Sequence, residues 1–412
     1  MRILVHTIFY APDLTGIAKY TAELCEWLAR RGHRVSVIAP PPYYPQWRVK
    51  PEYNAWRYAT ENLNGVRVHR TPIWVPRRPS GMKRLLHSLS FALTSVPVLI
   101  RETIQAPDVI FVVEPSFVNA FLALPAAAIC GARAWLHIQD FEIDLAYNLG
   151  QLRAARRLTE RVERAILNRF DVISSISRRL LTRAREKGVL CDKLFLLPNW
   201  FESSAIRPLA SPLRDELGIP ADTLVALFAG TLGVKQGVET IIKAARLLEN
   251  HPRLLFVICG EGPSGEELQK QSAGLNNVRF LPLFPANRLN DLLNLADIHL
   301  LTQVAAAADS VLPSKLIGMM ASGKPVVAAA RAHGEIADLI DGCGLLVAPN
   351  HVEDFAAAVL TLAANPIERI HRGQVARRRA LEFFEQESIL TNFERYLEAR
   401  LSQVAAANLT SQ

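Results

Sequence analysis

The chain is poor in cysteine: its 412 residues include five, and no two of them form a Cys-x-x-Cys pair. A metal site built on paired thiolates is therefore not expected, and scattered cysteines are typical of buried free thiols in a reducing cytosol. Long apolar runs are also missing. The longest, at 89–100 and 117–130, contain proline and are shorter than the roughly 20 residues that span a bilayer. We expect neither an integral membrane protein nor a cleaved signal peptide, since the N-terminus runs straight into a strand pattern.

An excess of one charge sign is present but moderate. The 47 lysines and arginines exceed the 39 acidic residues by 8. This excess favours an anionic substrate or an anionic membrane surface as a partner. Nucleic acid is not expected, because no basic run is interleaved with aromatic residues in a recognisable module. Half of the residues are hydrophobic, which excludes global disorder and allows a large core.

Short apolar strands alternate with helical patterns along the chain, which predicts an α/β fold with parallel sheets covered by helices on both faces. The strands form two series, at 3–5, 35–39, 109–113, 134–138 and 172–176, and at 225–229, 255–259, 278–281, 298–302, 326–329 and 345–347. A stretch without periodicity, 199–212, separates the series. We expect two doubly wound domains with a ligand between them, at the carboxyl ends of the strands. The charged tail at 368–401 is expected to be helical.

The stretch AADSVLPSKLIGMMASGKPVV, at 307–327, joins a Pro-Ser-Lys turn to the start of an apolar helix. The backbone N–H groups of Ser314, Lys315 and Leu316 should point outward without intrahelical partners, and the helix dipole adds positive charge there. With the lysine beside them, these groups are expected to form a binding site for a diphosphate. An ordinary βα crossover is the alternative.

Two glycine turns follow predicted strands in the same half of the chain. FAGTLGVKQG, at 228–237, carries Gly230, Gly233 and Lys235, while CGEGP, at 259–263, carries Gly260 and Glu261. Glycine permits close backbone approach to a ligand, and lysine supplies a mobile charge for a phosphate. The spacing is not that of a P-loop. Because these groups should meet at one edge of one sheet, their convergence favours a diphosphate ligand over plain turns.

In the N-terminal half, a helical pattern begins near Gly16, directly after the first strand. Gly16 would let the chain approach a ligand, although a tight strand-to-helix turn explains it as well. Nicotinamide binding is not favoured, because the GxGxxG spacing and an acidic residue at the end of the next strand are both missing. The segment PPPYYPQW, at 40–47, places Tyr43, Tyr44 and Trp47 either in an acceptor pocket or in a proline-stiffened loop.

The segment HIQDFEID, at 137–144, brings His137, Asp140 and Glu142 to the end of a predicted strand. A histidine or carboxylate there could accept a proton from an attacking hydroxyl. A helix start that Asp140 caps, without chemistry, is the alternative. Upstream, basic residues flank an apolar stretch at 74–101. This pattern suits either a peripheral contact with anionic lipid or a core helix with a solvated basic start.

These segments, in this order, resemble the retaining glycosyltransferases of family 4, which have the GT-B fold of two Rossmann-like domains facing across a cleft. The likeness covers nearly the whole chain, and its most specific parts are PDLTGIAKYTAELCEWLARRGHRVSVI, AGTLGVKQG, CGEGP and SKLIGMMASGKPVV. PPYYPQW, LHIQDFEID and ADSVLPSKL are similar to the colanic acid biosynthesis fucosyltransferase type.

The resemblance implies an acceptor-binding domain at 1–200, a donor-binding domain at 201–385 and a last helix, 386–412, that crosses back to the first domain. Lys235 and Lys315 on the donor side, with His137 and Asp140 on the acceptor side, are the expected catalytic residues. With the glycine turns, the expected donor contacts are Gly16, Gly230, Gly233, Lys235, Gly260, Glu261, Leu283, Asp309, Ser310, Ser314, Lys315 and Leu316. The expected acceptor contacts are Tyr43, Tyr44, Trp47, Asp140 and Glu142.

The chain departs from the family pattern at two places. The family commonly has two glutamates eight positions apart before ASGKPVV, and here those positions hold Ser310 and Gly318. The second glutamate usually holds the ribose hydroxyls, and Asp309 is a partial substitute for the first. An arginine often found shortly before the position of Lys235 is also missing. These gaps concern ribose and sugar recognition and leave the diphosphate site in place.

The activity that the resemblance implies is transfer of a sugar from a nucleotide diphosphate sugar to a hydroxyl, with retention at the anomeric carbon. GDP-fucose is the first expectation for the donor and a UDP-sugar the second. No Asp-x-Asp motif occurs, so neither a metal nor a cofactor is expected. The expected acceptor is a lipid-linked saccharide of exopolysaccharide synthesis, at the cytoplasmic face of the membrane. A GT-B nucleotide-sugar epimerase and a non-catalytic subunit that binds nucleotide sugar or lipid are the alternatives.

Overall fold

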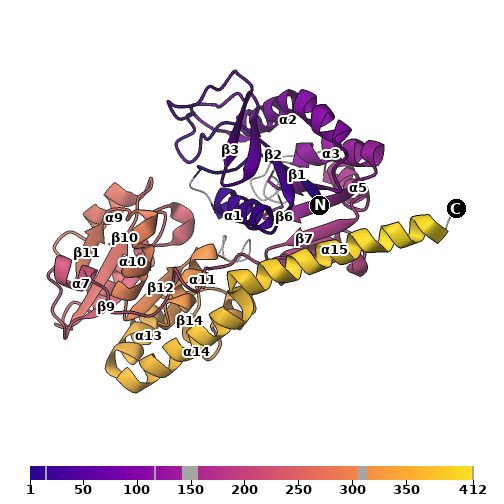
Figure 1. The fold of residues 1–412 in the computed structure, drawn as a ribbon. Helices are drawn as coiled ribbons and strands as arrows, with labels where there is room; N and C mark the ends of the chain where they lie inside the picture. The colour runs from indigo at the N-terminus through magenta and orange to yellow at the C-terminus, as the bar shows by residue number, and fades with distance from the viewer. Residues whose placement is uncertain (14–15, 116, 142–155, 305–312, 411–412) are drawn as a thin grey trace. The chain divides into compact units, whose positions relative to one another are not determined.

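The computed structural model describes residues 1–13, 16–115, 117–141, 156–304 and 313–410. The chain divides into two compact units, Met1–Pro198 with Leu390–Gln412 and Asn199–Ile389. Each unit is a largely parallel sheet with helices packed on it (Figure 1). The α/β class with parallel sheets in two units is therefore confirmed.

Within the described residues, the first unit contains an eight-stranded sheet with the order β3-β4-β2-β1-β5-β6-β7-β8. The strands are β1 (Arg2–Thr7), β2 (Arg34–Ala39), β3 (Ala59–Leu63), β4 (Val66–Arg70), β5 (Val109–Val113), β6 (Arg133–Ile138), β7 (Val172–Ser175) and β8 (Leu194–Leu196). The helices are α1 (Gly16–Arg30), α2 (Gly81–Ile104), α3 (Phe117–Cys130), α5 (Arg156–Leu167) and α6 (Arg178–Glu186). The strand order reverses between β1 and β5, so the loops after these two strands border the crevice where such sheets bind ligands.

The hairpin β3–β4 is a feature that the sequence pattern does not predict. Its strands pair antiparallel, and most of β3 is exposed to solvent. Asn64 and Gly65 join them with φ of 52° and 86°, the left-handed pair that a two-residue hairpin turn requires. An exposed edge strand needs no apolar alternation, and the three-residue β8 is too short to show one, so neither leaves a clear period in the sequence.

The second unit contains, in its described part, a six-stranded parallel sheet with the order β11-β10-β9-β12-β13-β14. The strands are β9 (Leu224–Ala229), β10 (Leu254–Cys259), β11 (Val278–Leu281), β12 (Ile298–Thr302), β13 (Val326–Ala329) and β14 (Gly344–Val347). The helices are α7 (Leu213–Glu216), α8 (Glu239–Leu247), α9 (Gly265–Gln271), α10 (Leu289–Leu295), α11 (Ser314–Ala321), α12 (Glu335–Ile340), α13 (Val352–Ala364) and α14 (Pro366–Phe384). The order reverses between β9 and β12, which makes their carboxyl ends the topological switch point.

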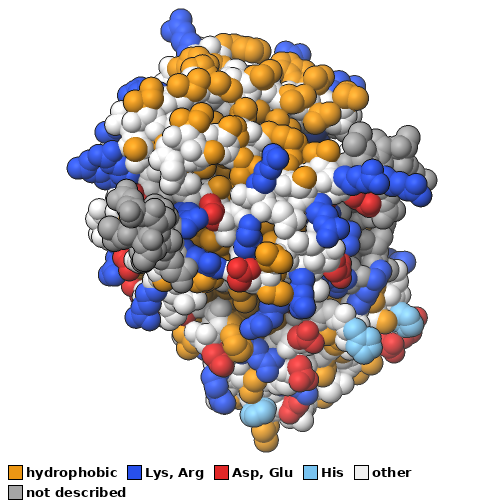
Figure 2. All heavy atoms as spheres, turned by 90° about the vertical axis from the view of Figure 1, so that its right-hand side faces the viewer, with side chains coloured by type: hydrophobic (Ala, Val, Ile, Leu, Met, Phe, Trp, Pro, Cys, Tyr) orange, Lys and Arg blue, Asp and Glu red, His pale blue; other side chains and the backbone are white. Residues whose placement is uncertain are grey.

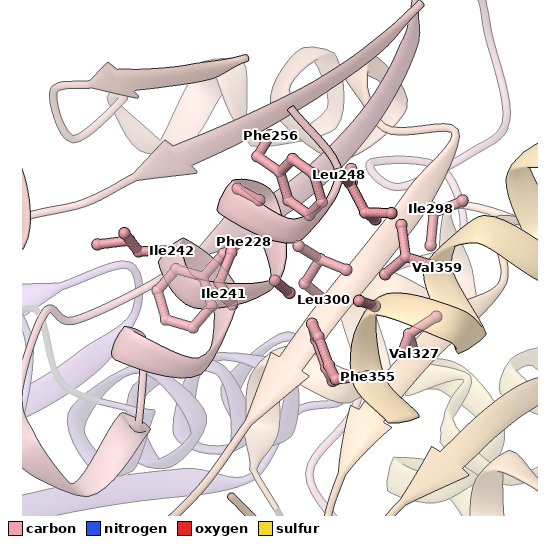
Figure 3. Close-up of a cluster of buried hydrophobic side chains, with 14 of the residues drawn as sticks. Phe228, Ile241, Ile242, Leu248, Phe256, Ile298, Leu300, Val327, Phe355 and Val359 are labelled. Carbon is pink, nitrogen blue, oxygen red and sulfur yellow. The ribbon is translucent and has the colours of Figure 1, made fainter. Parts of the chain in front are cut away.

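Each face of the second sheet carries its own apolar core. On one face, Phe228, Phe256 and Leu300 of the strands pack against α8 and against Phe355 and Val359 of α13 (Figure 3). On the other face, buried side chains of α11 and α14 pack against β12 and β13. Coverage of both faces explains why these strands read as continuous apolar runs rather than as alternating patterns.

The last helix, α15 (Gln386–Thr410), belongs to the first unit from Leu390 onward. Phe393 is 1% exposed, and its ring centroid lies 5.9 Å from that of Phe111 and 5.0 Å from that of Trp135. One residue further on, Glu394 accepts hydrogen bonds from Arg31 and pairs with His33 at 2.8 Å. The tail that the sequence predicts to be helical forms two helices, α14 and α15, on either side of Glu385, which forms a β-bridge with Phe201.

The cysteines differ in part from the expectation of buried thiols. Cys25, Cys259 and Cys343 are buried, but Cys130 is half-buried and Cys191 is exposed. Cys191 lies in a short 3-10 turn between α6 and β8 that buries none of its residues, so the expectation is wrong for this position. Among the helices described, none combines the length and the apolar composition needed to cross a bilayer.

The aromatic contacts of α15 predict that Phe393→Ala lowers the free energy of unfolding by about 3–5 kcal/mol, because a fully buried ring leaves a cavity. The measurement is urea denaturation followed by tryptophan fluorescence. Phe383→Ala is the matched control, since that ring is 46% exposed. Equal losses in both variants would contradict a core role for Phe393.

Candidate functional site

The candidate site of the second unit lies at the carboxyl ends of β9 and β12. Gly230 follows β9 directly, and α11, which carries Lys315, begins in the segment after β12. These two strands are neighbours at the switch point of the sheet. The chain order therefore brings the glycine turn and the start of α11 to the same edge, where parallel sheets bind their ligands.

The two glycine turns are packed backbone against backbone. Gly260 and Gly262 have φ of 148° and 157°, and a Cβ on either would overlap a carbonyl oxygen, that of Gly230 or that of Leu232. The Leu232 N–H donates to the Glu261 carbonyl at 2.9 Å, and the Leu232 carbonyl accepts from Ser264 N–H at 2.9 Å. Glycine is thus required here for the contact between the loops themselves, which holds the turn after β9 in place.

The ammonium group of Lys315 lies on the turn after β9. Its Nζ donates to Gln236 Oε1 at 2.8 Å and stands 4.1 Å from the centroid of the Phe228 ring. The methylene and ammonium groups also pack against Gly230. Burial lowers the pKa of Lys315 to about 7, because within the described residues no carboxylate compensates the charge. A bound diphosphate would supply that missing negative charge.

Lys235 stands on a short 3-10 turn, Val234–Gln236, next to the glutamine that holds Lys315. Its backbone carbonyl accepts a hydrogen bond from Val304 N–H at 3.1 Å. Its side chain is exposed and makes no hydrogen bond or ion pair with the described residues. Lys315 is therefore held by contacts with other side chains. The side chain of Lys235 is exposed, on a turn whose backbone is hydrogen-bonded to Val304.

The start of α11 differs in one detail from the sequence prediction. The N–H of Leu316 does not point outward: it donates to the Pro313 carbonyl at 3.0 Å, and its side chain is fully buried. A tight turn at the helix start uses up this donor. The N–H groups of Ser314 and Lys315 make no hydrogen bond to other described residues, so two of the three expected donors remain available to a ligand.

The other donor-side residues lie on neighbouring loops or outside the description. Glu261 and Leu283 follow β10 and β11, and both are exposed, Leu283 by 59%. Asp309 and Ser310, like Glu142 of the first unit, lie outside the described residues. At Gly318 a Cβ would meet the side chains of Leu293 and Ile206, an apolar surrounding that offers a carboxylate no hydrogen bonds.

In the first unit, α1 begins at Gly16 as predicted, and Gly16 is exposed. Just before it, Asp13 is 6% exposed and accepts a hydrogen bond from Tyr44 N–H at 3.1 Å. Burial raises the pKa of Asp13 to about 6. This contact joins the loop after β1 to the segment at 40–47.

The aromatic segment at 40–47 forms a packed cluster. Tyr43 is 1% exposed, and its ring lies 4.7 Å from His87 of α2 and 5.8 Å from Phe9. Trp47 and Tyr44 are half-buried, so their rings present part of their surface to solvent. The Trp47 ring also lies 5.7 Å from the Arg84 guanidinium, within range of a cation–π contact. Tyr43 is thus part of the core, while the rings of Tyr44 and Trp47 remain partly accessible to solvent.

His137 is buried at the end of β6. Its Nδ1 lies 2.9 Å from Ser174 Oγ, and its Nε2 accepts from Gln139 Nε2 at 3.2 Å. Burial lowers the pKa of His137 to about 3, so the ring is neutral at physiological pH. Both nitrogens are engaged with protein side chains, an arrangement that favours a positioning role. The expected proton acceptor Asp140 is half-buried and stands at the margin of the described residues.

Several residues of these sites are not predicted from the sequence. Gln236 and Phe228 hold Lys315, but only the three-dimensional contact distinguishes them from other loop and strand residues. Asp13 precedes the glycine loop in a Pro-Asp turn, which is a detectable signal. His87 and Arg84 of α2 contact the aromatic segment from more than 35 positions away in sequence. No local sequence pattern predicts these contacts.

Two parts of the chain match known protein families. Residues 15–200 match the family described as "Glycosyl transferase 4-like domain", and residues 211–379 match "Glycosyl transferases group 1". The chain therefore belongs to the family 4 glycosyltransferases with the GT-B fold. It is 39% identical over 407 residues to the putative colanic acid biosynthesis glycosyl transferase WcaI of Escherichia coli K12, covering 95% of this chain and 98% of that protein.

Solved structures agree in fold. Sucrose-phosphate synthase from Thermosynechococcus elongatus has a TM-score of 0.78 and 19% identity, with 99% of this chain and 100% of that chain covered. HepE of Anabaena, solved in complex with UDP and glucose, has a TM-score of 0.68 and 19% identity over 97% of this chain and 100% of that chain. At this level of identity the likeness establishes the fold alone.

The lowered pKa of Lys315 predicts a proton-linked affinity for nucleoside diphosphates. Free Lys315 loses its proton above about pH 7, while the bound diphosphate favours the charged ammonium. Affinity should therefore fall with rising pH, by up to about tenfold per unit above pH 7. Isothermal titration calorimetry with GDP and UDP between about pH 7 and 9 measures this.

The control is Lys315→Arg, whose guanidinium stays protonated over this range. Its affinity should be nearly independent of pH. A wild-type affinity that is equally flat would contradict the assigned position of Lys315 beside the diphosphate.

Proposed function

We propose that the protein is a retaining glycosyltransferase that moves a sugar from a nucleotide diphosphate sugar to a hydroxyl of a lipid-linked saccharide. The observation that carries the proposal is the half-buried Lys315 ammonium, held by Gln236 over Phe228 beside a glycine turn. A desolvated cation that meets no carboxylate among the described residues is suited to an anionic ligand. Membership of family 4 supports the donor diphosphate as that ligand.

In this mechanism the leaving diphosphate gains negative charge in the transition state. Lys235, Lys315 and the N–H groups of Ser314 and Lys315, which have no acceptor among the described residues, stabilise that charge, which is usually a large catalytic contribution. Because these groups supply the positive charge, we propose a metal-independent reaction. The acceptor hydroxyl attacks from the leaving-group face, and a diphosphate oxygen takes its proton. Asp140 is the alternative proton acceptor.

The donor is proposed to be GDP-fucose, with a UDP-sugar second. GDP-fucose follows from the similarity to the colanic acid type, while the UDP complexes of HepE support the second choice. The accessible rings of Tyr44 and Trp47 are suited to pack on the apolar face of an acceptor sugar. We place the enzyme in the cytoplasm, with the acceptor saccharide at the inner face of the membrane.

The mechanism predicts that Lys235→Ala and Lys315→Ala each lower transfer by roughly 10²-fold, the cost of removing one charge-stabilising group. The assay follows release of GDP from GDP-fucose, or of UDP from a UDP-sugar, in the presence of a membrane extract that carries lipid-linked saccharides. Lys243→Ala, a change of an exposed lysine of α8, is the matched control.

Near-normal rates in both variants would refute the mechanism. Conversion of the nucleotide sugar without any acceptor would instead favour a nucleotide-sugar epimerase. Nucleotide binding without turnover under any condition would favour a non-catalytic subunit.

We also propose that α2 contacts an anionic membrane surface. Its outer side exposes large apolar residues along its length, namely Met82, Leu85, Leu86, Leu93, Ile100 and Ile104. Exposed basic side chains accompany them, including Arg78, Lys83 and Arg101. Figure 2 shows hydrophobic side chains gathered at the top of the view with lysines and arginines around them, on the side where Figure 1 places α2. Apolar surface beside positive charge is typical of a peripheral membrane contact.

This surface predicts binding to vesicles that contain phosphatidylglycerol and little binding to neutral vesicles. Arg78→Glu with Lys83→Glu should weaken co-sedimentation by roughly tenfold or more, since each basic residue near the surface contributes about 1 kcal/mol. Lys243→Glu with Lys270→Glu, a change of two exposed lysines of the second unit, controls for net charge. Sedimentation that ignores the anionic lipid content would contradict the proposal.

A further inference from the structure

The second unit has a basic hollow of about 600 Å³ at the amino ends of β12 and β13, away from the glycine turns. Four cationic side chains line it, Lys324, Arg369, Arg377 and Arg378, against one carboxylate, Asp297. Lys324 precedes β13 and Asp297 precedes β12, so the hollow lies at the sheet edge opposite to the candidate diphosphate site.

Two of the guanidinium groups are held in place by backbone carbonyls. Arg377 Nη1 donates to the carbonyls of Ile206 and Ala321, both at 2.7 Å. Arg369 Nη1 donates to those of Leu362 and Ala363 at 2.7 and 3.2 Å. Among the described residues, the other nitrogens of both groups have no hydrogen-bond acceptor. Fixed guanidiniums with spare donors are well suited to bind an oxyanion at two points.

The positive charge of the hollow is not balanced. Asp297 Oδ2 already accepts from Arg214 Nη2 and from Val225 N–H, each at 2.9 Å. The Lys324 ammonium is half-buried and forms no hydrogen bond with the described residues, and burial lowers its pKa. Arg378 likewise has no acceptor within the described part of the chain. An anion entering here would gain contacts that the protein does not supply.

The wall between the hollow and the sheet is rigid. A Cβ on Gly373 of α14 would overlap the carbonyl oxygen of Gly323, so the helix and the turn before β13 touch through their backbones. Gly323 itself has φ of 73°, and a Cβ there would lie 3.1 Å from the Pro208 ring. The cations therefore project from a backbone that is already packed, which lowers the ordering cost of binding a ligand.

The hollow also has apolar walls. Ile370 and Leu381 of α14 are 60% and 39% exposed, and Pro208 and Pro325 complete the lining. A free inorganic ion would leave this surface in contact with water. An anion that carries an apolar group would cover it and gain hydrophobic free energy.

We propose that this hollow binds a small organic phosphate, with the phosphate between Lys324 and Arg378 and an apolar portion against Ile370 and Leu381. The site is distinct from the donor diphosphate site: Ala321, whose carbonyl holds Arg377, ends α11, whereas Lys315 stands at its start. The proposal goes beyond the transfer reaction, and neither depends on the other.

Phenyl phosphate and inorganic phosphate are the probes, titrated into the full chain by calorimetry in the presence of saturating GDP, and in a repeat with UDP. Phenyl phosphate should bind more tightly than inorganic phosphate. Lys324→Gln and Arg378→Gln should each weaken it by about tenfold, the cost of one charged hydrogen bond. Lys243→Gln, a change of an exposed lysine of the same unit, should leave the affinity unchanged, and circular dichroism checks that every variant is folded.

Three results would overturn the proposal: no binding at millimolar phenyl phosphate in the presence of saturating nucleotide, equal affinity in Lys324→Gln and Lys243→Gln, or loss of the signal in Lys235→Ala, which would assign it to the donor site. Sugar transfer by Lys324→Gln should stay near the wild-type rate, so failure here is distinguishable from failure of the proposed function. Vesicles with phosphatidic acid distinguish the source of the phosphate: weaker sedimentation of Lys324→Gln than of Lys243→Gln would indicate a lipid headgroup, and equal sedimentation a soluble ester.

Discussion

The contact between the two glycine turns of the second unit is the constraint on which its candidate site depends. Gly260 and Gly262 meet the carbonyls of Gly230 and Leu232 at distances that no side chain allows. This contact fixes the turn after β9, and that turn supports the ammonium of Lys315 through Gln236 and Phe228. Burial against this turn and the Phe228 ring lowers the pKa of Lys315, because the charged ammonium is less well solvated there than in water.

Helix α11 connects two places where, among the described residues, positive charge exceeds negative charge. At its start, Lys315 lies over an aromatic ring beside the glycine turn. At its end, the carbonyl of Ala321 fixes Arg377, and the following turn carries Lys324 into the basic hollow. Its middle is apolar, with Gly318 against Leu293 and Ile206. One short helix with buried apolar residues thus separates the two cationic sites.

The first unit is organised around polar and aromatic anchors of the loops beside its switch point. Asp13 joins the segment before α1 to Tyr44, and α2 contributes His87 and Arg84 to the aromatic cluster. The same helix turns an apolar and basic side to solvent. Similarity to WcaI over nearly the full length of both chains extends across this unit.

The amino-acid sequence predicts the parallel α/β architecture, the helix start near Gly16 and the family, because buried parallel strands and glycine turns leave strong local patterns. It did not predict the edge strand β3 of the hairpin, which buries too little to impose a period. Three features became visible only in the three-dimensional structure. The Leu316 N–H donates within its own turn, and Tyr43 is buried in the core. Gln236 accepts a hydrogen bond from Lys315. The basic hollow depends on residues from Pro208 to Leu381. Such contacts depend on how segments that are far apart in the sequence pack together, and no local sequence pattern predicts that packing.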